Sequence, residues 1–210
     1  MPILHGVPLS PFVRKVRVAC AEKSIEYENK PQMPFGDRTD FLPISPLGKI
    51  PVWQEGDFTV PDSSVIIDYL EQTHPTPRLY PADPRQRATA CFLEEYADTR
   101  LVDALSTVFF QRFVRPNFFK QEPDQELVRE ALEEKVPECF EYLTGVLGDD
   151  DYLVGNAFSI ADIAVSSPFV NFKLAGEEVD AGRWPSVAAH VQRCWARPGY
   201  KAIVEGDTSG

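Results

Sequence analysis

The stretch Pro-Leu-Ser-Pro-Phe-Val-Arg-Lys-Val-Arg at residues 8–17 decides the fold of the first part of this chain. Ser10 stands directly before a proline, and proline is favoured at the first helical position because its missing N–H would have no partner there anyway. The pattern predicts a helix from Pro11 to about Lys23, after an apolar strand, with Ser10 as its N-cap. Backbone donors and the helix dipole converge on that hydroxyl, so it is placed either to cap its own helix or to hold a bound anion such as a thiolate.

A proline-rich stretch divides the chain. Four prolines fall within residues 74–84, and proline disrupts both helix interiors and central strands. Before this stretch, the patterns predict strands over residues 2–5, 26–30, 50–54 and 58–60, and a second helix over 64–72. After it, the apolar spacing is helical throughout. We expect an N-terminal α/β domain over residues 1–80 and an all-helical domain over 86–210, with a linker at about 74–85.

Prolines and capping signals mark the expected helices of the second half. A first long helix should end at Pro116, a second should run from 124 to 147 with a disturbance at Pro137, and a fourth should span 185–197. The third begins at Ser159, where Ser159 and Asp162 are spaced as a capping box. Residues 205–210 are small and polar, and we expect them to be mobile.

Composition narrows the possible partners. The 210 residues carry a net charge of −11, and the part after residue 80 holds 22 acidic against 13 basic side chains. This acidity argues against nucleic acid and anionic membranes as partners. No basic-then-apolar leader and no apolar run of about 18 residues is present, so we expect a cytoplasmic protein without a membrane span.

The cysteines do not indicate a metal or redox site. Cys20, Cys91, Cys139 and Cys194 are too far apart for a CxxC redox pair or for the spacing of zinc ligands. We therefore expect reduced, mostly buried thiols and no metal.

Taken together, these segments resemble the glutathione transferase superfamily, in which a thioredoxin-like α/β domain precedes an all-α domain. The resemblance spans essentially the whole chain. Its marks, in order, are Ser10–Arg14, Pro46–Val52, Asp62–Ser64, Leu79–Pro84, the capping box at Ser159–Asp162, and Trp184-Pro185. It implies that glutathione is the cosubstrate and that no metal is needed.

The resemblance implies a serine-type catalytic residue. In such members the hydroxyl before the first helix donates a hydrogen bond to the glutathione sulfur, and Ser10 occupies that position. No tyrosine lies among the first 26 residues, which excludes the tyrosine-type variant.

The resemblance also implies a binding site for the rest of glutathione. Ile50-Pro51 matches the cis-proline, whose preceding residue pairs its backbone with the cysteinyl part. Asp62-Ser63 matches the pair that holds the γ-glutamyl end, and capping of the following helix is an alternative use that is compatible with this role. Some relatives bind the glycyl carboxylate with a basic residue where this chain has Gly36. The implied glutathione residues are Lys49, Ile50, Pro51, Asp62, Ser63 and, as a substitute for that missing contact, Arg38.

The second substrate is expected between the domains, against an apolar wall. Candidates are aromatic residues at helical spacing, whose alternative use is core packing, and one arginine, whose alternative use is a salt bridge. These candidates for the electrophile pocket are Phe12, Phe109, Arg112 and Phe113, with Phe118 and Phe119 beside them.

From this resemblance we predict a cytosolic transferase of the detoxification type that adds the glutathione thiolate to a small hydrophobic electrophile. Glutathione peroxidase activity is a further hypothesis. Two alternatives stay open: a noncatalytic protein-binding or regulatory member of the same fold, and a glutathione-dependent isomerase. The resemblance further implies a two-fold homodimer, in which Asp98 of one chain approaches the γ-glutamyl ammonium bound to the other.

Overall fold

A computed structural model describes residues 1–208 of the chain. The chain divides into two compact units, the first being Met1–Leu79 and the second beginning at Tyr80. None of the described helices combines the length and the hydrophobicity needed to cross a membrane.

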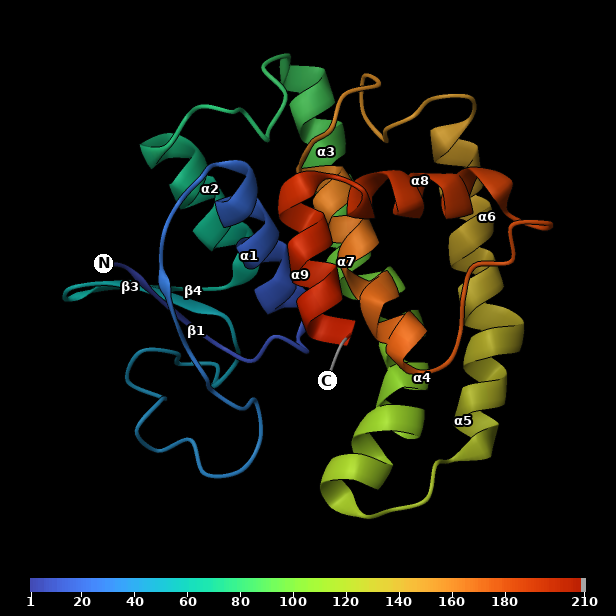
Figure 1. Ribbon diagram of the computed structural model, residues 1–210, viewed down its shortest axis with the longest axis horizontal. Coiled ribbons are helices and arrows are strands. Elements are labelled where there is room, and N and C mark those ends of the chain that lie inside the picture. Colours follow the sequence, from blue (N-terminus) through green and yellow to red (C-terminus); the bar gives the residue numbers. More distant parts are fainter. Residues whose placement is uncertain (209–210) are drawn as a thin grey trace. The chain divides into compact units, whose positions relative to one another are not determined.

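The first unit is built on a four-stranded sheet in the order β2-β1-β3-β4. β1 pairs with β2 in parallel, whereas β3 pairs with β1 and β4 in antiparallel. Figure 1 shows helices α1 and α2 side by side above these strands. All six predicted elements of this unit are confirmed, with boundaries shifted by no more than two residues: β1 (Ile3–His5), α1 (Pro11–Glu22), β2 (Glu28–Lys30), β3 (Val52–Glu55), β4 (Phe58–Pro61) and α2 (Ser63–Thr73).

A buried ion pair ties the end of this unit to its helices. The Lys23 side chain is 0% exposed, and its Nζ lies 2.7 Å from Glu71 Oε2. The same Nζ donates to the carbonyl oxygens of His74 at 2.7 Å and Pro77 at 2.8 Å. The Glu71 carboxylate in turn accepts the Leu79 N–H. Every charge in this group is hydrogen-bonded, so residues 74–79, expected to be linker, are held by the first unit.

The second unit is helical throughout its described length. Two long helical runs contain π-helical turns, named η. The first run consists of α3 (Pro84–Tyr96), η1 (Ala97–Leu101), α4 (Val102–Phe109) and η2 (Phe110–Phe119). The second consists of α5 (Gln125–Glu130), η3 (Ala131–Lys135) and α6 (Val136–Leu147). The remaining helices are α7 (Ile160–Leu174), α8 (Pro185–Trp195) and α9 (Pro198–Thr208).

One expectation about prolines is wrong and one is confirmed. Pro116 does not end the first run, which continues to Phe119. The second run continues through Pro137, and the expected disturbance is present there as the π-helical turn η3. A π-helical turn contains Pro116, and another ends two residues before Pro137. The i→i+5 hydrogen bonds of such a turn widen the helix and shift the carbonyl that a proline ring would otherwise meet.

Helix α7 forms the centre of the second unit, where Figure 1 shows it among the other helices. Every residue from Ile160 to Phe172 is buried, as expected for a helix that is covered on all sides. The aromatic ring of Phe140 on α6 stacks on Phe169 of α7 at a centroid distance of 5.4 Å. Neighbouring helices therefore depend on where α7 begins and ends.

The end of the chain also differs from expectation. Residues 205–208 continue helix α9 instead of forming a mobile tail, while residues 209 and 210 lie outside the described part. Pro198 occupies the first position of this helix, where proline is favoured. Tyr200 is fully buried, and its hydroxyl lies 3.0 Å from both Ser166 Oγ and Ser167 Oγ on α7. These hydrogen bonds attach α9 to the core.

The cysteine environments predict thiol reactivity. Cys20, Cys139 and Cys194 are 0% exposed, while Cys91 is half-buried, and none of the four forms a disulfide within residues 1–208. Burial raises the pKa of Cys20 to about 12 and that of Cys139 and Cys194 above the usual value.

Since the thiolate is the reactive form, at most one thiol should react with Ellman's reagent at pH 8 in the native protein. In guanidinium chloride all four thiols should react. Cys91→Ser should remove the native reaction; rapid reaction of two or more thiols in the folded protein would contradict this.

Candidate functional site

Ser10 lies in the loop between β1 and α1, directly at the helix N-terminus. Its backbone is extended, with φ −77° and ψ 126°, and its Oγ accepts a long hydrogen bond of 3.4 Å from the Val13 N–H. The capping role is therefore present. The hydroxyl hydrogen has no acceptor among residues 1–208, so Ser10 can cap its helix and still donate to an anion at the positive end of the helix dipole.

The loop before β3 presents an unpaired backbone edge. The Ile50-Pro51 peptide bond is cis, which confirms the expectation. Ile50 is not part of a strand, and neither its N–H nor its C=O forms a hydrogen bond within the described chain. An extended peptide lying beside Ile50 would find one donor and one acceptor there.

Ser45 stabilises this loop, a role that the sequence patterns did not predict. Ser45 is fully buried, and its Oγ donates to the Lys49 carbonyl at 2.7 Å and accepts the Lys49 N–H at 3.1 Å. The only sequence signal is a hydroxyl residue four positions before the Lys-Ile-Pro run, and side-chain hydrogen bonds of this local kind are common in loops.

Asp62 and Ser63 begin helix α2. The Asp62 carboxylate accepts the N–H groups of Ser64 at 2.9 Å and Val65 at 3.3 Å, so the capping use is realised. Neither the N–H nor the hydroxyl of Ser63 has a hydrogen-bond partner among residues 1–208. The helix start thus keeps two free donors, an arrangement that suits a carboxylate.

The Asp62 backbone is in an uncommon conformation. Its φ is +80° and its ψ 129°, a region that side chains other than glycine enter only when the surroundings impose it. The Asp62 N–H donates to the Pro51 carbonyl at 3.3 Å. This hydrogen bond connects the α2 start to the cis-proline loop, so the two predicted binding segments are in contact.

Two basic residues belong to the same unit but differ in their surroundings. Lys49 is exposed, and its ammonium is unpaired within the described chain. Arg38 donates from Nη1 to the Gly48 carbonyl at 3.0 Å, and to the Pro34 carbonyl at 3.4 Å. Arg38 therefore braces the loop, while other N–H groups of its guanidinium remain available.

Buried cations on α1 are a second feature that was missed. Arg14 is 0% exposed and donates to the Pro8 carbonyl at 3.1 Å, just before Ser10. Lys15 is 1% exposed, and its Nζ donates to Ser64 Oγ at 3.0 Å in the first turn of α2. Two adjacent charges within an apolar helix pattern were the available signal, because such charges are buried only when they are paired.

The candidates for the electrophile pocket have varied surroundings. Phe12 lies in the first turn of α1 and is half-buried. Phe109 and Phe113 stack on each other with centroids 5.0 Å apart, and Phe109 is 7% exposed. Arg112 forms the salt bridge named as its alternative use, with Nη1 2.5 Å from Glu177 Oε1. Phe118 and Phe119 are exposed.

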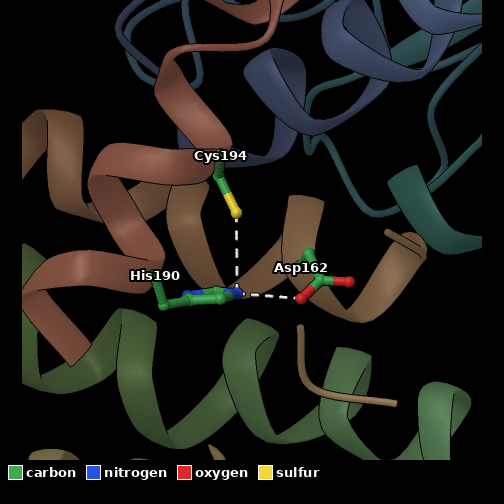
Figure 2. A group of neighbouring side chains, drawn as sticks. All are labelled: Asp162, His190 and Cys194. Carbon is green, nitrogen blue, oxygen red and sulfur yellow. Dashed lines mark hydrogen bonds and ion pairs between the residues drawn. The ribbon is translucent and has the colours of Figure 1, made fainter. Parts of the chain in front are cut away.

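One group of side chains has the composition of a metal site. Asp162, His190 and Cys194 are fully buried, and their ligand atoms lie within 4.8 Å of one another. Figure 2 shows the His190 ring between the other two side chains. His190 Nε2 lies 2.8 Å from Asp162 Oδ1 and 3.5 Å from Cys194 Sγ.

The surroundings of this group fit hydrogen bonding better than metal coordination. A metal-bound histidine normally donates its second N–H to an acceptor, whereas His190 Nδ1 is buried without a hydrogen-bond partner among the described residues. Burial also raises the pKa of Cys194, which favours the thiol over the metal-binding thiolate. Asp162 already accepts the N–H groups of Leu153 and Ser159 in addition to His190. We therefore assign the group to the connection between α7 and α8.

Comparisons with known proteins identify the family of the chain. Residues 4–78 match the family profile "Glutathione S-transferase, N-terminal domain", and residues 101–198 match "Glutathione S-transferase, C-terminal domain". The chain belongs to the glutathione S-transferase family. The resemblance and the expected fold, a thioredoxin-like domain followed by a helical domain, are thereby confirmed.

Individual relatives support the assignment over most of the chain. A probable glutathione S-transferase, parC, from Nicotiana tabacum is 30% identical over 194 residues, which cover 90% of this chain and 82% of the relative. A maleylacetoacetate isomerase from Rattus norvegicus is 27% identical over 199 residues, covering 91% and 86%. The crystal structure of a glutathione S-transferase from Methylobacterium radiotolerans, in complex with glutathione sulfonate, has a TM-score of 0.78 and 30% identity, with 97% and 94% coverage.

The buried Asp162 carboxylate gives a prediction about stability. Asp162→Ala would leave His190 and the Leu153 and Ser159 N–H groups without their acceptor, and removing one partner of such a buried group costs about 3–5 kcal/mol. The matched control is Asp124→Ala, because Asp124 caps α5 through two backbone N–H groups but is exposed; an N-cap is worth about 1 kcal/mol. Guanidinium unfolding measures both, and equal losses would show that the burial of Asp162 adds nothing.

Proposed function

We propose that this protein is a glutathione transferase that activates glutathione as a thiolate and adds it to a small hydrophobic electrophile. The observation that carries the proposal is the Ser10 hydroxyl, which stands at the α1 N-terminus with a hydrogen available for donation. Family membership supports transferase chemistry at the coarser level.

Activation of glutathione requires only a modest electrostatic stabilisation of its thiolate. A free thiol titrates near about 8.5, and each unit by which its pKa falls corresponds to about 1.4 kcal/mol in favour of the anion. One hydroxyl donor together with a helix N-terminus provides about one to two such units. The nucleophile comes from the cosubstrate, so the protein's task is to position it and to stabilise its charge.

Three segments of the first unit would hold the tripeptide. Ser63 would bind the γ-glutamyl carboxylate through its free N–H and hydroxyl, with Asp62 facing the ammonium. Ile50 would pair its free N–H and C=O with the cysteinyl backbone. The glycyl carboxylate would lie near Lys49, whose ammonium is unpaired in the described chain, with Arg38 as a second donor.

Of the candidates for the electrophile pocket, Phe12 of the first unit is half-buried, and we propose that it contacts the electrophile. Arg112 is engaged with Glu177, so its role would be to hold that part of the second unit in place. We further propose a homodimer in the cytoplasm, as the family resemblance implies.

A glutathione-dependent isomerase is the second candidate, favoured by the maleylacetoacetate isomerase relative. That branch typically has a Ser-Cys pair after the first serine, where this chain has Pro11 and Phe12. The proposed transferase function is therefore better supported than the isomerase function.

Replacing Ser10 tests the proposal directly. Ser10→Ala removes the donor to the sulfur, and because a hydrogen bond to a charged group is worth about 1.5–3 kcal/mol, conjugation of 1-chloro-2,4-dinitrobenzene should fall at least tenfold. The affinity for glutathione should change little. The ultraviolet absorbance of bound thiolate, titrated with pH, should show a higher pKa for the bound thiol than in the wild type.

Ser10 is also a helix cap, so a control must separate the two roles. Ser10→Asp keeps a capping acceptor but offers no donor and places a negative charge beside the sulfur. This variant should retain wild-type thermal stability yet lose activity as Ser10→Ala does. More than half of the wild-type activity in Ser10→Ala would reduce Ser10 to a cap. Ser10→Cys should gain measurable disulfide reduction with glutathione.

The γ-glutamyl site predicts a separate kinetic signature. Asp62→Ala and Ser63→Ala remove contacts remote from the sulfur, so each should raise KM for glutathione about tenfold with a smaller fall in kcat. Asp83→Ala is the matched control, because Asp83 caps α3 through the N–H groups of Arg85 and Gln86 just as Asp62 caps α2. It should lose similar stability without a change in KM. An unchanged KM in both site variants would move the γ-glutamyl site elsewhere.

A further inference from the structure

The second unit contains a pocket that the proposed function does not use. It has a volume of about 190 Å³ and lies between the C-terminal part of α7, the segment after it, and α8. Four buried side chains contribute to its apolar surface, Phe169, Phe172, Ala188 and Val191. Known sites for drug-sized ligands usually measure about 300–1,000 Å³, so this pocket suits a compact molecule smaller than glutathione.

An aromatic wall closes one side of the pocket. The Trp195 ring is held by a hydrogen bond of 3.2 Å from its Nε1 to the Ser166 carbonyl. The Lys173 ammonium lies 5.9 Å from the centre of this ring, at the limit of a cation–π contact. Such a contact orients the ammonium at the pocket without neutralising its charge.

The charges at the pocket are of both signs and are not paired with each other. Lys173 and Glu178 both line the pocket and are both exposed, and neither forms an ion pair within residues 1–208. The third charged residue, Glu177, is balanced by Arg112 at 2.5 Å. The pocket therefore presents one free cation and one free anion beside an apolar floor.

We propose that this pocket binds a zwitterionic amino acid with an apolar side chain of about the size of leucine or phenylalanine. The carboxylate of such a ligand would pair with Lys173 and its ammonium with Glu178, while the side chain would contact Phe169, Phe172 and Trp195. A simple carboxylate would leave Glu178 unpaired, and a simple amine would leave Lys173 unpaired. The charge pattern thus selects a ligand that carries both groups.

The pocket draws its lining from residues 169–195, whereas the proposed glutathione contacts come from residues 10–63. No side chain is shared, so the two ligands should bind independently. This inference goes beyond the transferase proposal and does not depend on it.

The experiment compares three small molecules that share a phenyl ring. L-phenylalanine carries both charges, phenylacetate only the carboxylate and phenethylamine only the ammonium. Ligand-observed NMR titration of the full chain should give L-phenylalanine a dissociation constant between about 0.1 and 1 mM. Each of the other two should bind at least fivefold more weakly.

Variants locate the site. Lys173→Met and Glu178→Gln keep the side-chain bulk and remove one charge, and each should weaken L-phenylalanine binding at least fivefold. The control is Lys201→Met, which removes an exposed cation from α9 outside the pocket lining. It should leave binding unchanged. Ala188→Phe should fill the floor and abolish binding, with folding checked by circular dichroism.

Three results would overturn the proposal. The first is the lack of measurable L-phenylalanine binding at 20 mM. The second is equal binding of phenylacetate or phenethylamine. The third is binding that survives both charge-removing variants or is displaced by glutathione, which would place the ligand in the proposed glutathione site. Transferase activity enters none of these readouts, so failure of the proposed function would leave the result intact.

Discussion

The helical unit depends on the hydrogen bonds that the buried Asp162 carboxylate accepts. This carboxylate accepts hydrogen bonds from Leu153, Ser159 and His190 while being completely buried. An isolated buried charge is strongly unfavourable, whereas one surrounded by donors is tolerated and fixes its neighbours in place. Because α7 is the central helix, fixing its first turn also fixes the surfaces against which the other helices pack.

Helix starts are used in two different ways in this protein. At α7 the start is closed, since the capping groups are buried and satisfied by protein partners. At α1 and α2 it is only partly satisfied: the hydroxyl of Ser10 and the N–H of Ser63 keep hydrogens without acceptors in the described chain. Stability comes from the closed helix start, and the capacity to bind anions comes from the open ones.

Local sequence signals located most of the elements, because caps, prolines and apolar spacing act within a few residues. The capping box at Ser159 and the helix at Pro11 are examples of this. The sequence indicated a salt bridge as one use of Arg112 but could not identify Glu177 as its partner, and it could not reveal the positive φ of Asp62. Both depend on contacts formed only in the folded chain. Pro198 was ambiguous because proline follows one helix as readily as it begins the next.

The buried ammonium of Lys23 has a consequence for recombining halves of related proteins. The prolines after His74 suggest a natural crossover point there, yet the carbonyls of His74 and Pro77 are partners of Lys23, and the Leu79 N–H is a partner of Glu71. A chimera joined at residue 74 would bring foreign carbonyls to a charge that has no access to water. A junction directly after Leu79 would keep every partner of that ammonium native.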